Sequence, residues 1–204
     1  MESNREKVSY CIGLQTGGQI LGQFSELDHE LLKKGLTDAL AQKTPALEQE
    51  EIKNILQALQ KQVQDQQKVY VEELSLKNKE DGETFLEENK EKEGIETLAS
   101  GLQYKVLKEG TGTIPSMHDT VSVHYRGSLL NGNVFDSTYE REKPQEFPVN
   151  RVIPGWSEAL KLMKVGDKWQ IFIPSYLAYG DQGYGPQIEP NSTLIFEMEL
   201  VKIH

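Results

Sequence analysis

The chain lacks the features of a disulfide-stabilised or membrane-spanning protein. Its 204 residues include one cysteine, Cys11, so no internal disulfide can form and a small secreted scaffold is excluded. No run approaches the roughly 18 uninterrupted apolar residues of a membrane span. The polar stretch 1–7 lacks the apolar segment of a signal peptide. We therefore expect a cytoplasmic protein without membrane insertion, or a periplasmic protein if a leader has been removed.

Positive charge is also scarce. The 22 Lys and Arg residues against 32 Asp and Glu residues leave a formal net charge of −10. A protein that binds nucleic acid regardless of its sequence needs a dense basic face, and an anionic lipid surface attracts the same kind of face. We therefore expect neither nucleic acid nor a lipid surface as a partner.

Motifs for metal, phosphate or covalent chemistry are missing as well. The four histidines lie in different segments without the paired spacing of a zinc site, so no metal and no cofactor are expected. The glycines between Gly13 and Gly18 match neither a dinucleotide fingerprint nor a P-loop. Cys11 lies among small residues, and we interpret it as buried packing rather than as a nucleophile. Conventional acid–base or covalent catalysis is therefore poorly supported.

The composition changes sharply near residue 100. Residues 1–100 hold one of the eight prolines and four of the sixteen aromatic residues, and residues 101–204 hold the others. A proline-poor half rich in Glu, Lys, Gln and Leu is typical of helices, whereas Val, Ile, Phe and Tyr between Pro and Gly are typical of a sheet. We predict an α+β protein in three parts: a helical dimerisation domain at 1–46, a long stalk helix at 47–94 and a β-rich domain at 95–204.

Two short helices are predicted over residues 5–23 and 29–42. The first contains four glycines, each of which costs about 1 kcal/mol relative to Ala in a helix interior, so it needs close packing to persist. The two helices and the apolar start of a third supply little core. We favour a second copy of the chain packed across a two-fold axis. The alternative is a monomeric bundle in which the short helices fold back on the long one.

The third predicted helix covers residues 47–93 and would be on the order of 70 Å long. Its apolar residues follow helical spacing as far as Leu74, whereas residues 77–93 are charged almost all round. A helix with one apolar and one polar end is typical of a bridge through solvent. Gly82 and Gly94 are the positions where we expect a bend or an end.

In the second half, apolar and polar residues alternate over short segments, a pattern typical of antiparallel strands. One short helix is predicted among these strands, starting near Trp156 and ending near Met163. A long loop over residues 174–191 carries Tyr179 and Tyr184. Aromatic side chains in such a loop, together with Trp156 at the start of the helix, predict a shallow apolar cavity with polar tips. The expected ligand is therefore apolar.

Several strings of residues identify a family. They are VHYRGSL at 123–129, VFDS at 134–137, VIPGW at 152–156, LAYG at 177–180 and PNSTLIFE at 190–197. Together they resemble the FKBP-type peptidyl-prolyl cis/trans isomerases. SYCIGLQ at 9–15, GLTDAL at 35–40 and FLEENK at 85–90 resemble the bacterial subfamily that includes the macrophage infectivity potentiator (Mip) proteins. The resemblance implies an FKBP-like antiparallel sheet wrapped on a short helix, and a V-shaped homodimer joined by the N-terminal helices.

The resemblance also assigns the residues of the site. Those it implies to be catalytic are Tyr125, Phe135, Asp136, Trp156, Tyr179 and Phe196. Those it implies to bind the substrate are Arg141, Phe147, Val152, Ile153, Tyr184 and Ile188. Macrolide inhibitors of the family are implied ligands too. Gln145 stands where some members have a further aromatic residue, which argues for weaker macrolide binding here.

The implied function is catalysis of prolyl cis/trans isomerisation, which accelerates folding of proline-containing chains, with chaperone-like capture of unfolded or partly folded clients by the dimer. A dimeric clamp that holds such chains without turnover is the competing interpretation, since two weak sites on one body gain avidity. A structural rod is disfavoured because it would not need the aromatic loop. Asp136 either interacts with the distorted carbonyl or, as we favour slightly, fixes the cavity wall through Arg141 and Tyr125.

Overall fold

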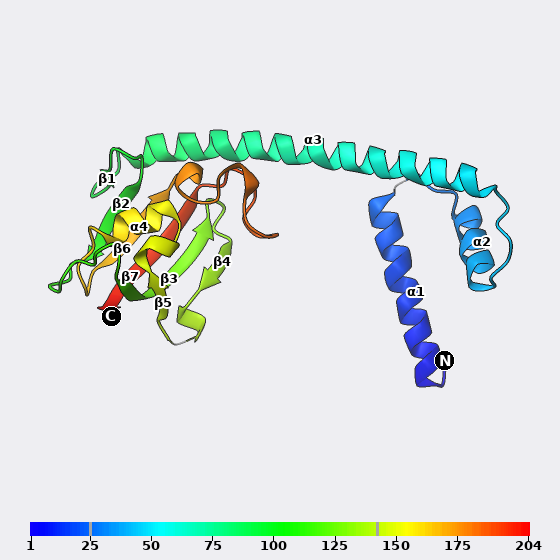
Figure 1. Cartoon of the computed structure of the whole chain (residues 1–204), viewed down its shortest axis with the longest axis horizontal. Helices are drawn as coiled ribbons and strands as arrows, with labels where there is room; N and C mark the ends of the chain where they lie inside the picture. Colours follow the sequence, from blue (N-terminus) through cyan, green and yellow to red (C-terminus); the bar gives the residue numbers. More distant parts are fainter. Residues whose placement is uncertain (25, 142) are drawn as a thin grey trace. The chain divides into compact units, whose positions relative to one another are not determined.

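The computed structural model describes residues 1–24, 26–141 and 143–204. The described chain divides into two compact units, Met1–Val63 and Gln64–His204. The first unit is helical, and the second carries the whole sheet (Figure 1). The predicted α+β class, with helices first and an antiparallel sheet after them, is confirmed.

The N-terminal unit contains α1 (Asn4–Gln23), α2 (His29–Leu40) and the start of α3 (Gln49–Asn89). Ser3 and Glu6 form a capping box at the start of α1, and the Asp28 side chain accepts two backbone N–H groups at the start of α2. Such caps satisfy donors that have no partner within the helix. No residue of α1 or α2 is buried in the single chain. The described helices therefore do not form the packed monomeric bundle that was the alternative.

The glycines of α1 contact no other described element. A Cβ atom added at Gly13, Gly17, Gly18 or Gly22 would meet no atom within 4 Å. Cys11 is exposed, so its interpretation as buried packing is wrong for the single chain, because no described element covers this face of α1.

The helix α3 runs without a break from Gln49 to Asn89. Gly82 lies inside it and is buried, so the expected bend or end at this residue is wrong. Glycine permits a close approach here, since a Cβ atom at Gly82 would lie 2.3 Å from Thr193 Oγ1. Gly94 follows the helix with a φ of +79°, in the left-handed region that glycine adopts readily.

One face of the second half of α3 packs within the C-terminal unit. Its members recur with helical spacing at positions 71, 74, 75, 78, 82, 85, 86 and 89. The ring of Phe85 lies 5.8 Å from that of Phe172. Asn89 Nδ2 donates to Gln103 Oε1 at 2.9 Å, and Gln103 Nε2 donates to the Leu86 carbonyl at 2.7 Å. The expectation that residues 77–93 are surrounded by solvent is wrong for this face, because its polar members pair with the sheet and with the loop before the last strand.

The sheet is antiparallel, with strand order β1-β2-β6-β7-β3-β4 and with β5 paired to β3. The strands are β1 (Glu96–Thr97), β2 (Gln103–Lys108), β3 (Thr120–Leu129), β4 (Val134–Ser137), β5 (Gln145–Pro148), β6 (Lys168–Ile173) and β7 (Leu194–Ile203). The helix α4 (Pro154–Leu160) adds Trp156, Ala159 and Leu160 to the core formed with the sheet. The predicted wrapping of the sheet on one short helix is confirmed.

Short 3-10 helices connect the strands around the site. They are η1 (Tyr139–Arg141), η2 (Val149–Arg151), η3 (Ser175–Leu177) and η4 (Gly180–Gln182). Pro154 starts α4, where its missing N–H costs no hydrogen bond, so the helix begins before the predicted Trp156. Among the described residues, no helix carries an apolar stretch long enough to cross a bilayer.

Candidate active site

An open cavity of about 690 Å³ lies where α4, the sheet and the loop after β6 meet. Its lining side chains are Tyr125, Phe135, Asp136, Gln145, Phe147, Arg151, Val152, Ile153, Trp156, Tyr179, Tyr184, Gln187, Ile188 and Phe196. Every predicted site residue except Arg141 belongs to this lining. Arg141 lines an adjoining hollow together with Phe135 and Asp136. Arg151 and Gln187 were not predicted, because an exposed polar residue in a connection gives no signal of its own in the sequence.

Trp156 lies at the centre of the aromatic cluster and is 5% exposed. Three rings meet its indole nearly at right angles: Tyr125 at 5.0 Å and 78°, Phe147 at 5.5 Å and 84°, and Phe196 at 5.1 Å and 82°. Edge-to-face contacts of this kind favour a fixed arrangement of rings. Its Nε1 is buried without a hydrogen-bond partner among the described residues. The floor of the cavity is therefore rigid and almost entirely apolar.

A glycine on β3 makes room for the next pair of rings. Phe135 from β4 and Phe196 from β7 lie 5.5 Å apart at 83°. Gly127 lies between them, and a Cβ atom there would approach ring carbons of both phenylalanines to 2.6 Å. The absence of a side chain at Gly127 therefore lets Phe135 reach the cavity.

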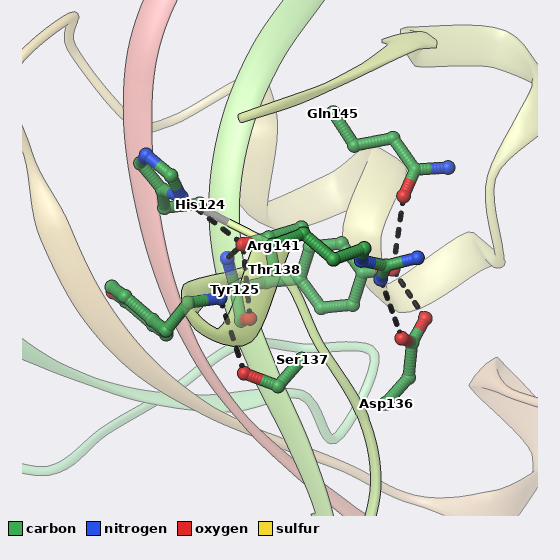
Figure 2. Close-up of polar contacts among 8 residues, drawn as sticks. His124, Tyr125, Asp136, Ser137, Thr138, Arg141 and Gln145 are labelled. Carbon is green, nitrogen blue, oxygen red and sulfur yellow. Dashed lines mark hydrogen bonds and ion pairs between the residues drawn. The ribbon is translucent and has the colours of Figure 1, made fainter. Parts of the chain in front are cut away.

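The polar wall of the cavity is built from Tyr125, Asp136 and Arg141 (Figure 2). Tyr125 Oη donates to Asp136 Oδ2, and Arg141 Nη2 donates to Asp136 Oδ1 at 2.7 Å. Burial, followed by the hydrogen bond to Asp136, raises the pKa of Tyr125 to about 12. The Tyr125 hydroxyl is therefore a proton-bearing donor at neutral pH, and both carboxylate oxygens of Asp136 are engaged.

Thr138 connects this wall to β3, which the sequence did not predict. The Thr138 side chain is fully buried. Its Oγ1 accepts the Tyr125 backbone N–H at 2.9 Å, and it lies 3.1 Å from His124 Nδ1 (Figure 2). The Thr138 backbone carbonyl accepts the Arg141 N–H at 3.1 Å. Thr138 therefore links the strand that carries Tyr125, through its hydroxyl, to the 3-10 turn that carries Arg141, through its backbone carbonyl.

The loop after β6 forms the outer rim. The rings of Tyr179 and Tyr184 stack 4.9 Å apart at 23°. Tyr184 and Ile188 exchange two backbone hydrogen bonds, at 2.7 and 3.2 Å, and Ile188 is buried against the cavity. Burial, with a smaller effect of Tyr184, raises the pKa of Tyr179 above its usual value. The rim therefore offers aromatic surface and a protonated hydroxyl.

Charged and metal-ligating groups are few among the described residues of the site. Within the described part of the chain, no group of three or more His, Cys, Asp or Glu side chains could hold a metal ion. The charged members of the lining are Asp136, which is paired, and Arg151. The geometry suits binding and conformational change of an apolar segment.

The C-terminal unit combines an antiparallel sheet wrapped on one short helix with an aromatic cavity beside that helix. Residues 112–201 match the family described as FKBP-type peptidyl-prolyl cis-trans isomerase, and residues 5–106 match the domain amino terminal to it. The chain therefore belongs to the FKBP-type peptidyl-prolyl cis-trans isomerase family. The resemblance inferred from the sequence and the predicted isomerase activity are confirmed.

Full-length relatives share both halves of the chain. The FKBP-type 22 kDa peptidyl-prolyl cis-trans isomerase of Escherichia coli strain K12 is 44% identical over 97% of this chain and 94% of its own length. Outer membrane protein MIP of Legionella longbeachae is 40% identical over 100% of this chain and 87% of its own. The crystal structure of FkpA from Escherichia coli covers 100% of this chain and 98% of its own, with a TM-score of 0.79 and 35% identity.

Proposed function

We propose that the aromatic cavity is the active site and that it binds the prolyl segment of an unfolded or partly folded chain. The observation that carries the proposal is the cluster around Trp156: three rings meet the indole edge-on, and its buried N–H has no hydrogen-bond partner among the described residues. A proline ring is a compact apolar group without a backbone N–H, so it enters such a floor without leaving a donor unpaired.

The mechanism that we propose needs no acid or base. Rotation about the prolyl peptide bond faces a barrier of about 18–20 kcal/mol because the bond has partial double-bond character. Twisting removes the resonance, so the transition state is less charge-separated than the planar amide. A cavity that keeps water from the amide therefore favours the twisted form. Trp156, Phe135, Val152 and Phe196 would hold the proline ring.

The polar groups at the rim would orient the flanking peptide. The Tyr179 hydroxyl and the Ile153 backbone N–H are the donors that we assign to the neighbouring carbonyls. Phe147, Tyr184 and Ile188 would contact the side chains on either side of proline. We assign Asp136 to the cavity wall, since Tyr125 and Arg141 already occupy both of its oxygens.

Isomerisation and binding without turnover are separated by one experiment on the full chain. Exchange NMR spectroscopy of a short peptide with one Leu-Pro bond should show faster cis–trans interconversion at catalytic amounts of the protein. Trp156→Ala should abolish most of this effect while the peptide alone stays slow, with a relaxation time of tens to hundreds of seconds. Unchanged interconversion with the native chain would refute the proposed site.

The N-terminal half supports a further proposal, a homodimer that captures clients. The helices α1 and α2 bury no residue in the single chain, and Val8, Ile12, Leu14 and Leu21 are about half exposed or more. Such apolar surface is typical of a protein interface. We assign residues 1–46 to dimerisation, 47–94 to a stalk and 95–204 to the isomerase domain.

Macrolides are proposed ligands of the aromatic cavity. We expect Gln145 to lower their affinity, because some members of the family have an aromatic residue at this position.

The location of the protein is proposed from its relatives. The cytoplasmic location expected from the sequence gains no support from them, because the relative whose name contains a location is an outer membrane protein. The periplasmic alternative fits that name better. Fractionation of cells that express the complete gene would decide between the two compartments.

A further inference from the structure

The rim of the cavity is held by a helix that does not line it. We define the pocket lip as residues 179–188, which contribute Tyr179, Tyr184, Gln187 and Ile188 to the cavity. The lip is irregular, and Gly180, Gly183 and Gly185 all have positive φ. A segment of this kind has few regular hydrogen bonds of its own and depends on its anchors for a single conformation.

Asn191 ties the lip to its surroundings just after Ile188. Its backbone, with a φ of +56°, donates its N–H to the Gly180 carbonyl at 2.8 Å. Its side-chain Nδ2 donates to Ser75 Oγ on α3 at 2.8 Å. Asn191 therefore connects the start of the lip to the helix α3 through its backbone N–H and its side chain.

Asn78, one turn further along α3, holds the residues between Ile188 and Asn191. Its Nδ2 lies 3.0 Å from the Pro190 carbonyl and 3.1 Å from Glu189 Oε2, and it donates to both. Pro190 has no N–H, so its carbonyl is the backbone group through which this position can be held.

Close contact between α3 and the end of the loop makes these bonds possible. Gly82 lies against Thr193, and a Cβ atom at Gly82 would come within 2.3 Å of Thr193 Oγ1 and 3.3 Å of Thr193 Cβ. Ser75, Asn78 and Gly82 belong to the same face of α3. A side chain at position 82 would push the helix away from the loop.

We infer that Ser75 and Asn78 are positioning residues for the pocket lip, so that the helix α3 sets the affinity of the cavity for its prolyl peptide. The inference rests on the proposed active site. The physical reason is preorganisation: a lip already in its bound conformation loses less entropy when the peptide binds. Neither residue lines the cavity, so their effect reaches the substrate through residues 189–191, which they bind, and then through the lip.

The test compares two double variants of the full chain. Ser75→Ala with Asn78→Ala removes the anchors, and Thr84→Ala with Gln67→Ala removes similar polar groups from exposed positions of the same helix. We expect the anchor variant to raise KM for the Leu-Pro peptide about threefold to tenfold, with kcat changed less, because each lost hydrogen bond has a modest net value. Hydrogen exchange at the Ile188 and Asn191 amides should accelerate about tenfold, while amides of β3 and β7 keep their rates.

A KM equal to that of the control variant would overturn the inference, and so would unchanged exchange at both lip amides. If the double variant does not fold, Ser75→Ala alone is compared with Thr84→Ala by the same two measurements. A native chain that fails to accelerate peptide isomerisation would instead refute the proposed active site. If the native chain is active and the anchor variant has the same KM and the same exchange rates as the control variant, only the positioning role is refuted.

Discussion

The Thr138 hydroxyl accepts the backbone N–H of Tyr125 at 2.9 Å inside the sheet. The same residue holds the turn that carries Arg141, whose guanidinium pairs with Asp136 on the cavity wall. The conformation of the wall therefore depends on a buried residue, Thr138, that does not line the cavity.

Replacing Thr138 by Val keeps the shape of the side chain and removes its hydroxyl. The Tyr125 N–H would then be buried without an acceptor, which costs about 1–3 kcal/mol. We expect a lower thermal midpoint and a lower kcat/KM, and Thr138→Ser should restore both. The measurements are calorimetry and exchange NMR with the Leu-Pro peptide. An active, fully stable Thr138→Val variant would contradict this role.

The raised pKa of Tyr125 predicts how stability changes in alkaline solution. Tyrosine in an unfolded chain ionises near pH 10, whereas burial and then the bond to Asp136 raise the pKa of Tyr125 to about 12 in the folded protein. The folded state therefore binds this proton more tightly. The resulting stabilisation is complete below about pH 10 and is lost as the pH rises towards 12.

Tyrosine titration followed by ultraviolet absorbance checks this prediction. Partial burial, followed by the hydrogen bond to Glu96, also raises the pKa of Tyr104 to about 12. Tyr104 and Tyr125 should therefore both ionise near pH 12 in the native chain, and Tyr125→Phe should remove one of these two ionisations. If the variant and the native chain titrate alike at high pH, the hydrogen bond to Asp136 does not hold the proton as described.

The two roles considered for Asp136 predict different activities for the variants Asp136→Asn and Asp136→Ala. If the carboxylate fixes the wall, Asp136→Asn keeps an acceptor for Tyr125 and should stay within about threefold of native kcat/KM, whereas Asp136→Ala should lose about tenfold, consistent with hydrogen bonds of modest net value. If the charge acts on the substrate carbonyl, both variants should lose activity equally. Full activity in both variants would refute both roles.

The variant Gly127→Ala tests whether Phe135 can reach the cavity only because position 127 has no side chain. The new methyl group would lie 2.6 Å from ring carbons of Phe135 and Phe196, so at least one ring must move. Overpacking of this kind costs about 1–3 kcal/mol. We expect a loss of peptide affinity, measured by titration of the intrinsic tryptophan fluorescence, while Ser128→Ala on the same strand stays near native. Equal affinity in both variants would show that the rings adjust freely.

Light scattering tests the proposed dimer. The full chain should have twice its mass of 23.1 kDa in solution, because the apolar faces of α1 and α2 lack cover in one chain. Residues 64–204 form a compact unit of their own and should have the mass of a monomer. A full chain that scatters as 23.1 kDa would exclude the dimer.

The sequence indicated the aromatic half of the site well. Phe135, Trp156 and Phe196 come from a helix and strands far apart in the chain, yet each lies in a string of residues typical of the family, and all three line one cavity. The α+β class followed in the same way from where proline and the aromatic residues are concentrated.

The polar supports were decided by the tertiary structure. Ser75, Asn78 and Gly82 lie on a buried helix face, but polar and small side chains look like a solvated face when hydrophobicity is the only signal. Thr138 likewise resembles any threonine near a strand until its partner at Tyr125 is known. The sequence alone determined which apolar groups must be buried, since that depends on the side chain itself. Which polar group pairs with which depends on segments brought together only by the fold, and so only the structure could decide it.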